Sequence, residues 1–202
     1  MPDPVTFYLI RHAEPAYGPE GPVCLGRKLD LPLSPEGRRQ AADMAERVQG
    51  IKFDAIYVSP LKRAVQTAEA LDGHCPRIVA PELTEVSGGE WDGMRFSEIH
   101  ARYPSWFDNS GDGGRTPPGG ESDAEALGRG MALMDRLKDH PGETFALVTH
   151  SGLGRILLCH LMGMPMHLKR LIPMDYASVT RVEYAGGAWR VELSEPLMDG
   201  IR

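Results

Sequence analysis

An arginine and a histidine stand side by side near the start of the chain, directly after a β-prone stretch. Residues 6–10 (TFYLI) form that stretch, and Arg11 and His12 follow it at once. Ligands in open α/β sheets bind beyond the carboxyl ends of the strands. An arginine grips phosphate oxygens and a neutral imidazole attacks phosphorus, so this pair suits a phosphate. An exposed polar turn is the alternative for the pair taken alone.

Two later residues are predicted at the same edge of the sheet. Arg63 falls in the first turn of a predicted helix, where backbone amides favour an anion and where an arginine is unfavourable unless a negative group lies nearby. His150 ends the predicted strand 144–150 (TFALVTH), and Ser151 and Gly152 open the helix that follows. A solvated arginine and a histidine satisfied within the core are the alternatives. Otherwise the four residues form one anion site at a single edge of a sheet.

The elements that must position these residues alternate between strand and helix. Strands are predicted at residues 6–10, 53–59, 77–80 and 144–150. Helices are predicted to begin at Ser34-Pro35 and Ser59-Pro60, to cover residues 96–107, and to begin again at Ser122 and Ser151. This alternation indicates a parallel sheet. Two alternating runs around Gly186-Gly187 indicate a terminal hairpin.

The composition fits one soluble domain over residues 1–202. Hydrophobic residues make up 42% of the chain and charged residues 25%, and no apolar run is long enough to cross a bilayer. Residues 1–14 lack the basic and apolar regions of a secretory signal, which predicts a cytoplasmic protein without a membrane partner. A net charge of −6 disfavours a nucleic-acid partner, because duplex binding normally needs a basic face.

No metal or other cofactor is expected. Cys24, Cys75 and Cys159 are odd in number and widely spaced, without a CxxC motif, so we interpret them as reduced thiols. The seven histidines show no HExxH motif and no other compact ligand spacing.

Several acids lie in a glycine-containing segment near the middle of the chain. They are Glu82, Glu85, Glu90, Asp92 and Glu98. Such carboxylates are usually solvated, and their spacing alone does not choose one of them as an acid or base. Residues 16–33 and 108–120 are predicted loops, the first of them lying over the site.

The order of these motifs resembles the histidine phosphatase superfamily, also called phosphoglycerate mutase-like, over about residues 6–165. The matching segments are LIRHAE (9–14), DLPLSPEGRRQA (30–41), VSPLKRAVQTAEAL (58–71), ELTEVSGGEWDG (82–93) and ALVTHSG (146–152). The resemblance implies a three-layer α/β/α sandwich with a mostly parallel central sheet.

The resemblance also implies a role for individual residues. His12 would be the catalytic nucleophile, Glu85 the proton donor, and Arg11, Arg63 and His150 the phosphate pocket, with His150 protonated. Gly26, Arg27 and Ser151 are further candidates for binding the substrate. Three positions depart from the family pattern: Ala13 and Pro15 in the first motif, and Gly18, where an asparagine often helps to bind phosphate.

These residues predict a metal-independent phosphomonoesterase that hydrolyses a small phosphorylated metabolite through a phosphohistidine. The segment CLGRKLDLPLS (24–34) resembles that of α-ribazole phosphatases, with one extra residue between Gly26 and Asp30, so α-ribazole 5′-phosphate is one candidate substrate. A phosphoglycerate mutase or sugar bisphosphatase is the alternative, and an inactive phospholigand-binding module is the third. A homodimer is left open.

Overall fold

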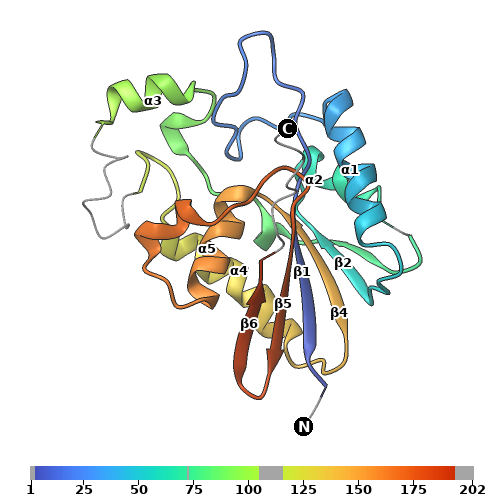
Figure 1. The fold of residues 1–202 in the computed structure, drawn as a ribbon. Coiled ribbons are helices and arrows are strands. Elements are labelled where there is room, and N and C mark those ends of the chain that lie inside the picture. Colours follow the sequence, from blue (N-terminus) through green and yellow to red (C-terminus); the bar gives the residue numbers. More distant parts are fainter. Residues whose placement is uncertain (1–2, 72, 105–115, 194–202) are drawn as a thin grey trace, which may run out of the picture.

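The computed structural model describes residues 3–71, 73–104 and 116–193 (Figure 1). Its strands are β1 (Val5–Arg11), β2 (Ala55–Val58), β3 (Arg77–Val79), β4 (Thr144–Thr149), β5 (Val179–Ala185) and β6 (Ala188–Glu192). Its α-helices are α1 (Pro35–Arg47), α2 (Lys62–Ala68), α3 (Phe96–Arg102), α4 (Asp123–Leu137) and α5 (Ser151–Leu161). Short 3₁₀ helices cover Pro81–Leu83 (η1), Gly89–Trp91 (η2) and Met166–Leu171 (η4).

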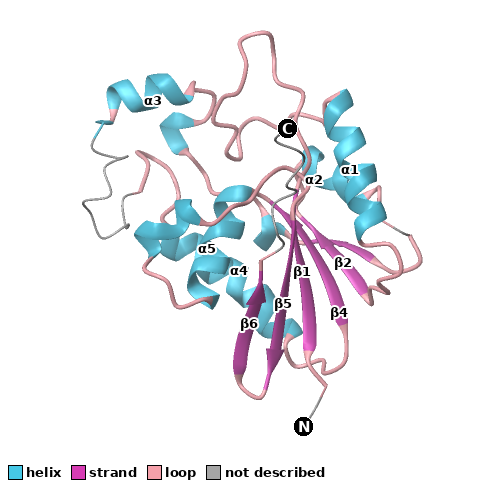
Figure 2. Cartoon of the chain, viewed as in Figure 1, coloured by secondary structure: helices cyan, strands magenta, loops and turns pink. Residues whose placement is uncertain are grey.

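The six strands form one sheet in the order β3-β2-β4-β1-β5-β6 (Figure 2). The pairs β2–β3, β2–β4 and β1–β4 are parallel, whereas β5 and β6 form an antiparallel hairpin beside β1. Gly186 and Gly187 make the hairpin turn with φ of 59° and 83°, a conformation that suits glycine at both central positions. The predicted mostly parallel α/β fold and the terminal hairpin are therefore confirmed.

Helices cover both faces of the sheet, because alternate residues of the central strands point to opposite sides. Phe7 and Leu9 of β1 pack in one core cluster with residues of α4 and α5, and Ile10 packs in a second cluster with residues of α1 and α2. Figure 1 shows α4 and α5 on one side of the sheet and α1 on the other. This double cover buries the central strands and leaves their ends to build a site.

Two helix starts illustrate how the sequence sets local structure. Helix α1 begins where expected, since the Ser34 hydroxyl accepts a hydrogen bond from the Gly37 N–H and Pro35 occupies the first turn. The sequence predicted that the next helix begins at Ser59-Pro60, but helix α2 begins at Lys62. The Lys62 N–H is bound by the Asp30 carboxylate from a distant loop, a contact that local sequence does not reveal.

Other strands and helices are shorter than expected. Strand β2 covers Ala55–Val58 within the predicted 53–59, and β3 covers Arg77–Val79 at the edge of the sheet. Helix α3 ends at Arg102, shortly before Pro104, a residue that interrupts helical hydrogen bonding. The rest of the predicted helix 96–107 and most of the predicted loop 108–120 lie outside the described residues. None of the described helices has the length and apolar character needed to cross a bilayer.

Candidate active site

Three neighbouring parallel strands end at the same edge of the sheet. Strand β4 lies between β2 and β1, and Arg11 of β1 is in register with Thr149 of β4. The His12 N–H donates to the Thr149 carbonyl at 2.9 Å, which fixes the two chain segments immediately beyond the strands. The imidazole rings of His12 and His150 consequently lie with their centroids 5.0 Å apart.

A cavity of about 340 Å³ opens at this edge. Six of the residues that line it are Arg11, His12, Arg63, Glu85, Ser151 and Tyr176. They come from segments that are distant in sequence and meet where the strands end, as predicted for a ligand site in an open α/β sheet.

His12 is held as a neutral imidazole with a free lone pair. Its side chain is 4% exposed, and its Nδ1 lies 2.7 Å from the Ala13 carbonyl oxygen. A carbonyl only accepts hydrogen bonds, so Nδ1 carries the proton and Nε2 keeps the lone pair. Burial lowers the pKa of His12 well below its usual value, and the nearby Arg63 and Arg11 lower it further. The geometry therefore leaves Nε2 suited to attack an electrophile.

His150 is fully buried and takes its orientation from Ser59. The Ser59 hydroxyl lies 2.7 Å from His150 Nε2 and also accepts from the Leu61 N–H at 3.4 Å. When this hydroxyl donates to Nε2, the imidazole proton is on Nδ1. Burial lowers the pKa of His150 well below its usual value, and His12 and Arg63 act in the same direction. Burial therefore favours a neutral His150 in the empty site, and the expectation of a protonated His150 beside a bound phosphoryl group stays a prediction.

The two arginines are fixed by backbone carbonyls. Arg11 donates through Nη1 to the Met174 carbonyl at 2.6 Å, and its guanidinium carbon lies 3.9 Å from the centre of the Tyr176 ring. Arg63 is 1% exposed and donates to the carbonyls of Leu29 and Gly26 at 3.0 and 2.9 Å. Carbonyls hold a guanidinium in place without neutralising its charge.

Three buried side-chain nitrogens around the cavity have no hydrogen-bond partner within the described part of the chain. They are Nε of Arg11, Nε of Arg63 and Nδ1 of His150. Buried polar groups are nearly always satisfied, so a cluster of unsatisfied donors beside two positive charges indicates a site for an anion. Across the same described ranges, no three His, Cys, Asp or Glu side chains gather as a set of metal ligands.

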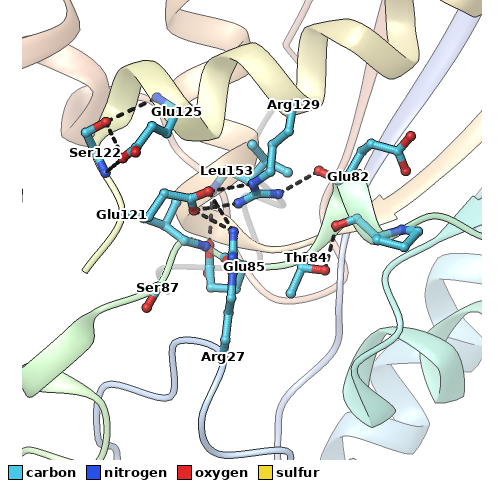
Figure 3. A network of polar contacts seen from close by, with 12 residues as sticks. Arg27, Glu82, Thr84, Glu85, Ser87, Glu121, Ser122, Glu125, Arg129 and Leu153 are labelled. Atoms are coloured by element: carbon cyan, nitrogen blue, oxygen red, sulfur yellow. Dashed lines mark hydrogen bonds and ion pairs between the residues drawn. The ribbon is translucent and has the colours of Figure 1, made fainter. Parts of the chain in front are cut away.

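Glu85 is separated from its acidic neighbours by position. Its carboxylate accepts hydrogen bonds from the backbone N–H groups of Val86, Gly152 and Leu153, the last two at the start of α5 (Figure 3). It is the one acid of the predicted group, all of which the structure describes, that lines the cavity.

The other four acids have different surroundings. Glu82 pairs with Arg136, and Asp92 accepts from the Gly88 N–H. Glu98 caps the start of α3, and Glu90 lies 3.5 Å from the Tyr103 hydroxyl. Spacing in the sequence does not carry this distinction, because it depends on where η1 and η2 turn the chain.

The remaining candidates divide into two groups. Gly26 and Ser151 line the cavity. Gly26 has a φ of 47°, and a Cβ at this position would lie only 1.8 Å from Asp92 Oδ1, so the backbone requires glycine here. Arg27 does not belong to the cavity lining. Its guanidinium donates instead to the Glu85 carbonyl and to the Glu121 carboxylate, each at 2.7 Å. The structure thus gives Arg27 a contact that supports the backbone of Glu85.

Several site residues were missed in the sequence. Tyr17 and Tyr176 line the cavity, and Ser59 orients His150. Glu121 is bound by Arg27 and Arg129, and Arg129 also donates to the Glu82 carbonyl at 2.6 Å (Figure 3). For Ser59 a signal existed, since it ends a predicted strand next to the one that ends in His150. The other contacts join segments whose proximity is set by the tertiary fold.

The family is decided by comparison with known proteins. A family model described as the histidine phosphatase superfamily, branch 1, matches residues 7–195. The chain belongs to the histidine phosphatase superfamily. Within this superfamily, the chain is similar to some proteins named as phosphatases and to others named as mutases.

Three relatives illustrate this. The chain is 32% identical over 189 residues to probable phosphoglycerate mutase GpmB from Yersinia enterocolitica, with 90% of this chain and 86% of the relative covered. It is 30% identical over 167 residues to phosphoserine phosphatase 1 from Hydrogenobacter thermophilus, with 80% and 78% covered. The solved structure of YhfR from Bacillus stearothermophilus matches with a TM-score of 0.82 at 29% identity, covering 94% of this chain and 96% of that one. The predicted family, its fold and an enzyme of the phosphatase class are confirmed.

The two buried histidines of this histidine phosphatase predict how its stability depends on pH. Because their pKa values are lowered in the folded protein, the unfolded chain binds more protons below about pH 6.5, the ordinary histidine value. The stability contributed by the neutral imidazoles is present above that pH and is lost as the pH falls below it. We expect the free energy of unfolding, measured by urea titration, to fall between about pH 7.5 and about pH 5.5 by less in His150→Asn than in the unaltered protein. An equal fall in both proteins would show that His150 is not held neutral.

Proposed function

We propose that this histidine phosphatase is a phosphomonoesterase in which His12 is the nucleophile. The observation that carries the proposal is the orientation of His12: its Nδ1–H donates to the Ala13 carbonyl, which leaves the lone pair on Nε2 free. Beside it lie two arginines whose buried Nε donors lack partners among the described residues. A phosphoryl group is the anion that such a nucleophile attacks and that guanidinium groups bind. Membership of the superfamily supports the same reaction class.

In the first step, the His12 Nε2 lone pair forms a bond to phosphorus while the bond from phosphorus to the ester oxygen breaks. Arg11, Arg63 and the Nδ1–H of His150 donate to the non-bridging oxygens and stabilise the charge that spreads over them. Glu85 gives a proton to the departing oxygen, so that an alcohol leaves rather than an alkoxide. The product is phosphohistidine at His12.

In the second step, water attacks the same phosphorus from the side that the alcohol has left. The Glu85 carboxylate takes a proton from this water, and the bond between phosphorus and His12 breaks. Inorganic phosphate leaves and Glu85 is protonated again. The position of Glu85 on the wall of the cavity supports its role in both proton transfers.

The substrate is a small phosphomonoester, and the segment 24–34 makes α-ribazole 5′-phosphate one candidate. The similarity to a probable phosphoglycerate mutase favours mutase activity as the second candidate. A mutase of this mechanism must start from phosphorylated His12 and return the phosphoryl group to the sugar acid. Turnover that requires a bisphosphate activator therefore separates the mutase from the phosphatase.

A substitution of His12 tests the proposed function. His12→Asn should abolish release of inorganic phosphate from every member of a panel containing α-ribazole 5′-phosphate, phosphoserine, 3-phosphoglycerate and an aryl phosphate, because the acceptor of the phosphoryl group is gone. His160→Asn, which changes an exposed histidine on α5, is the matched control and should leave turnover unchanged. Activity of His12→Asn within about tenfold of the unaltered protein would contradict the assignment.

The role of Glu85 is tested by the choice of leaving group. Glu85→Gln should slow phosphorylation of His12 by an alkyl phosphate about 10²- to 10⁴-fold, whereas an aryl phosphate, whose phenolate departs unprotonated, should be slowed much less. Single-turnover measurements isolate this step from hydrolysis of phosphohistidine. Glu82→Gln, a nearby acid paired with Arg136, should change neither substrate appreciably. Equal slowing of both substrates by Glu85→Gln would remove Glu85 as the acid.

A further inference from the structure

Two tyrosines from distant parts of the chain meet at the cavity. Tyr17 lies in the loop after β1, and Tyr176 lies in the segment before β5. Their hydroxyl oxygens are 2.9 Å apart. The Tyr176 ring packs against the Arg11 guanidinium and lies 5.8 Å, centre to centre, from the His12 ring. The hydroxyl pair is therefore next to the proposed nucleophile and one of its cations.

The pair has one proton more than its own hydrogen bond uses. Each neutral phenol carries one O–H donor, and the bond between the two hydroxyls consumes a single donor. Among the described residues, neither hydroxyl makes another hydrogen bond. Burial and the bond to Tyr176 raise the pKa of Tyr17, so its hydroxyl keeps its proton, and either of the two hydroxyls is able to donate to the other. The Tyr176 ring is the one that contacts Arg11 and lies beside His12. When Tyr17 donates to Tyr176, the Tyr176 proton is left over on the side of the nucleophile.

A transferred phosphoryl group has acceptor sites for this proton. Each of the two arginines already uses part of its guanidinium on backbone carbonyls. Gly18, which follows Tyr17, offers no side-chain donor from the same loop. A neutral donor that is charge-assisted by a phosphate dianion forms a short and strong hydrogen bond without adding another buried charge.

We propose that Tyr176 donates this remaining hydroxyl proton to a non-bridging oxygen of the bound phosphoryl group, with Tyr17 fixing its direction and polarising it. The inference rests on the proposed function, since it names a further phosphate-binding residue for the same site. It assigns Tyr17 as a positioning residue that acts through Tyr176.

Phenylalanine substitutions separate the hydroxyl from the ring. Tyr176→Phe keeps the aromatic face beneath Arg11 and removes only the donor. We expect it to weaken the binding of inorganic phosphate, measured by isothermal titration calorimetry, by about ten- to a hundredfold, in line with a hydrogen bond to a charged group. Tyr17→Phe should have a smaller effect, and the double variant should bind no more weakly than Tyr176→Phe, because both changes act on one donated proton. Tyr57→Phe, a tyrosine of β2 outside the cavity lining, is the matched control.

Phosphate binding is measured without turnover, so the outcome is independent of the proposed nucleophile. If the unaltered protein formed no phosphohistidine, the proposed function would fail while the binding data still reported on the tyrosines. Phosphate affinity of Tyr176→Phe equal to that of the unaltered protein would overturn the inference. Additive losses in the double variant would also overturn it, since they would mean two separate donors.

Discussion

The site depends on the register between β1 and β4. These strands are parallel neighbours in the centre of the sheet, and Arg11 lies opposite Thr149. Because side chains alternate along a strand, a shift by one residue would send Arg11 to the opposite face and separate His12 from His150. The hydrogen bond from the His12 N–H to the Thr149 carbonyl extends this register one residue beyond β1. Two buried layers of apolar side chains, one on each face, hold it in place.

Within this frame, neither arginine of the anion site forms an ion pair with a carboxylate of the described residues. Arg11 and Arg63 are fixed by carbonyls rather than by carboxylates, which keeps their full charge directed at the cavity. A buried cation without a counterion costs stability, and an anion relieves that cost on binding. The same positive charges and the same burial keep His12 neutral, which a nucleophile requires. The buried arginines thus lower the stability of the empty protein, and the same charges favour phosphate binding and keep His12 neutral for attack.

The acid is positioned by a different network. The Glu85 carboxylate rests on backbone N–H groups at the start of α5, while its own carbonyl accepts from Arg27. Arg27 is tied to Glu121, which Arg129 of α4 also binds (Figure 3). The loop that carries Glu85 is therefore fixed to both helices of one sheet face. These contacts give Arg27, which we predicted as a candidate substrate contact, a role in holding the backbone of Glu85.

The strand ends and their polar residues were predictable because strand and helix patterns are local. The runs that end in His12 and in His150 identify two strands, and parallel strands place their carboxyl ends together. The start of α2 was predicted wrongly, since the Asp30 carboxylate that binds the Lys62 N–H comes from a separate loop. The family resemblance singled out Glu85 among five acids, which spacing alone did not do. The contact of Ser59 with His150 and the pairing of Tyr17 with Tyr176, by contrast, depend on tertiary contacts. No pattern of residue types along the chain contains them.

The most direct test of the account is to find where phosphorus becomes attached. The protein is mixed with an alkyl phosphate, quenched within milliseconds under alkaline conditions that preserve phosphohistidine, digested and analysed by mass spectrometry. The account predicts phosphate on His12, formed at the rate at which the alcohol is released, and no such adduct in His12→Asn. Phosphate on any other residue, or alcohol release without an adduct on His12 while hydrolysis proceeds at the normal rate, would contradict it.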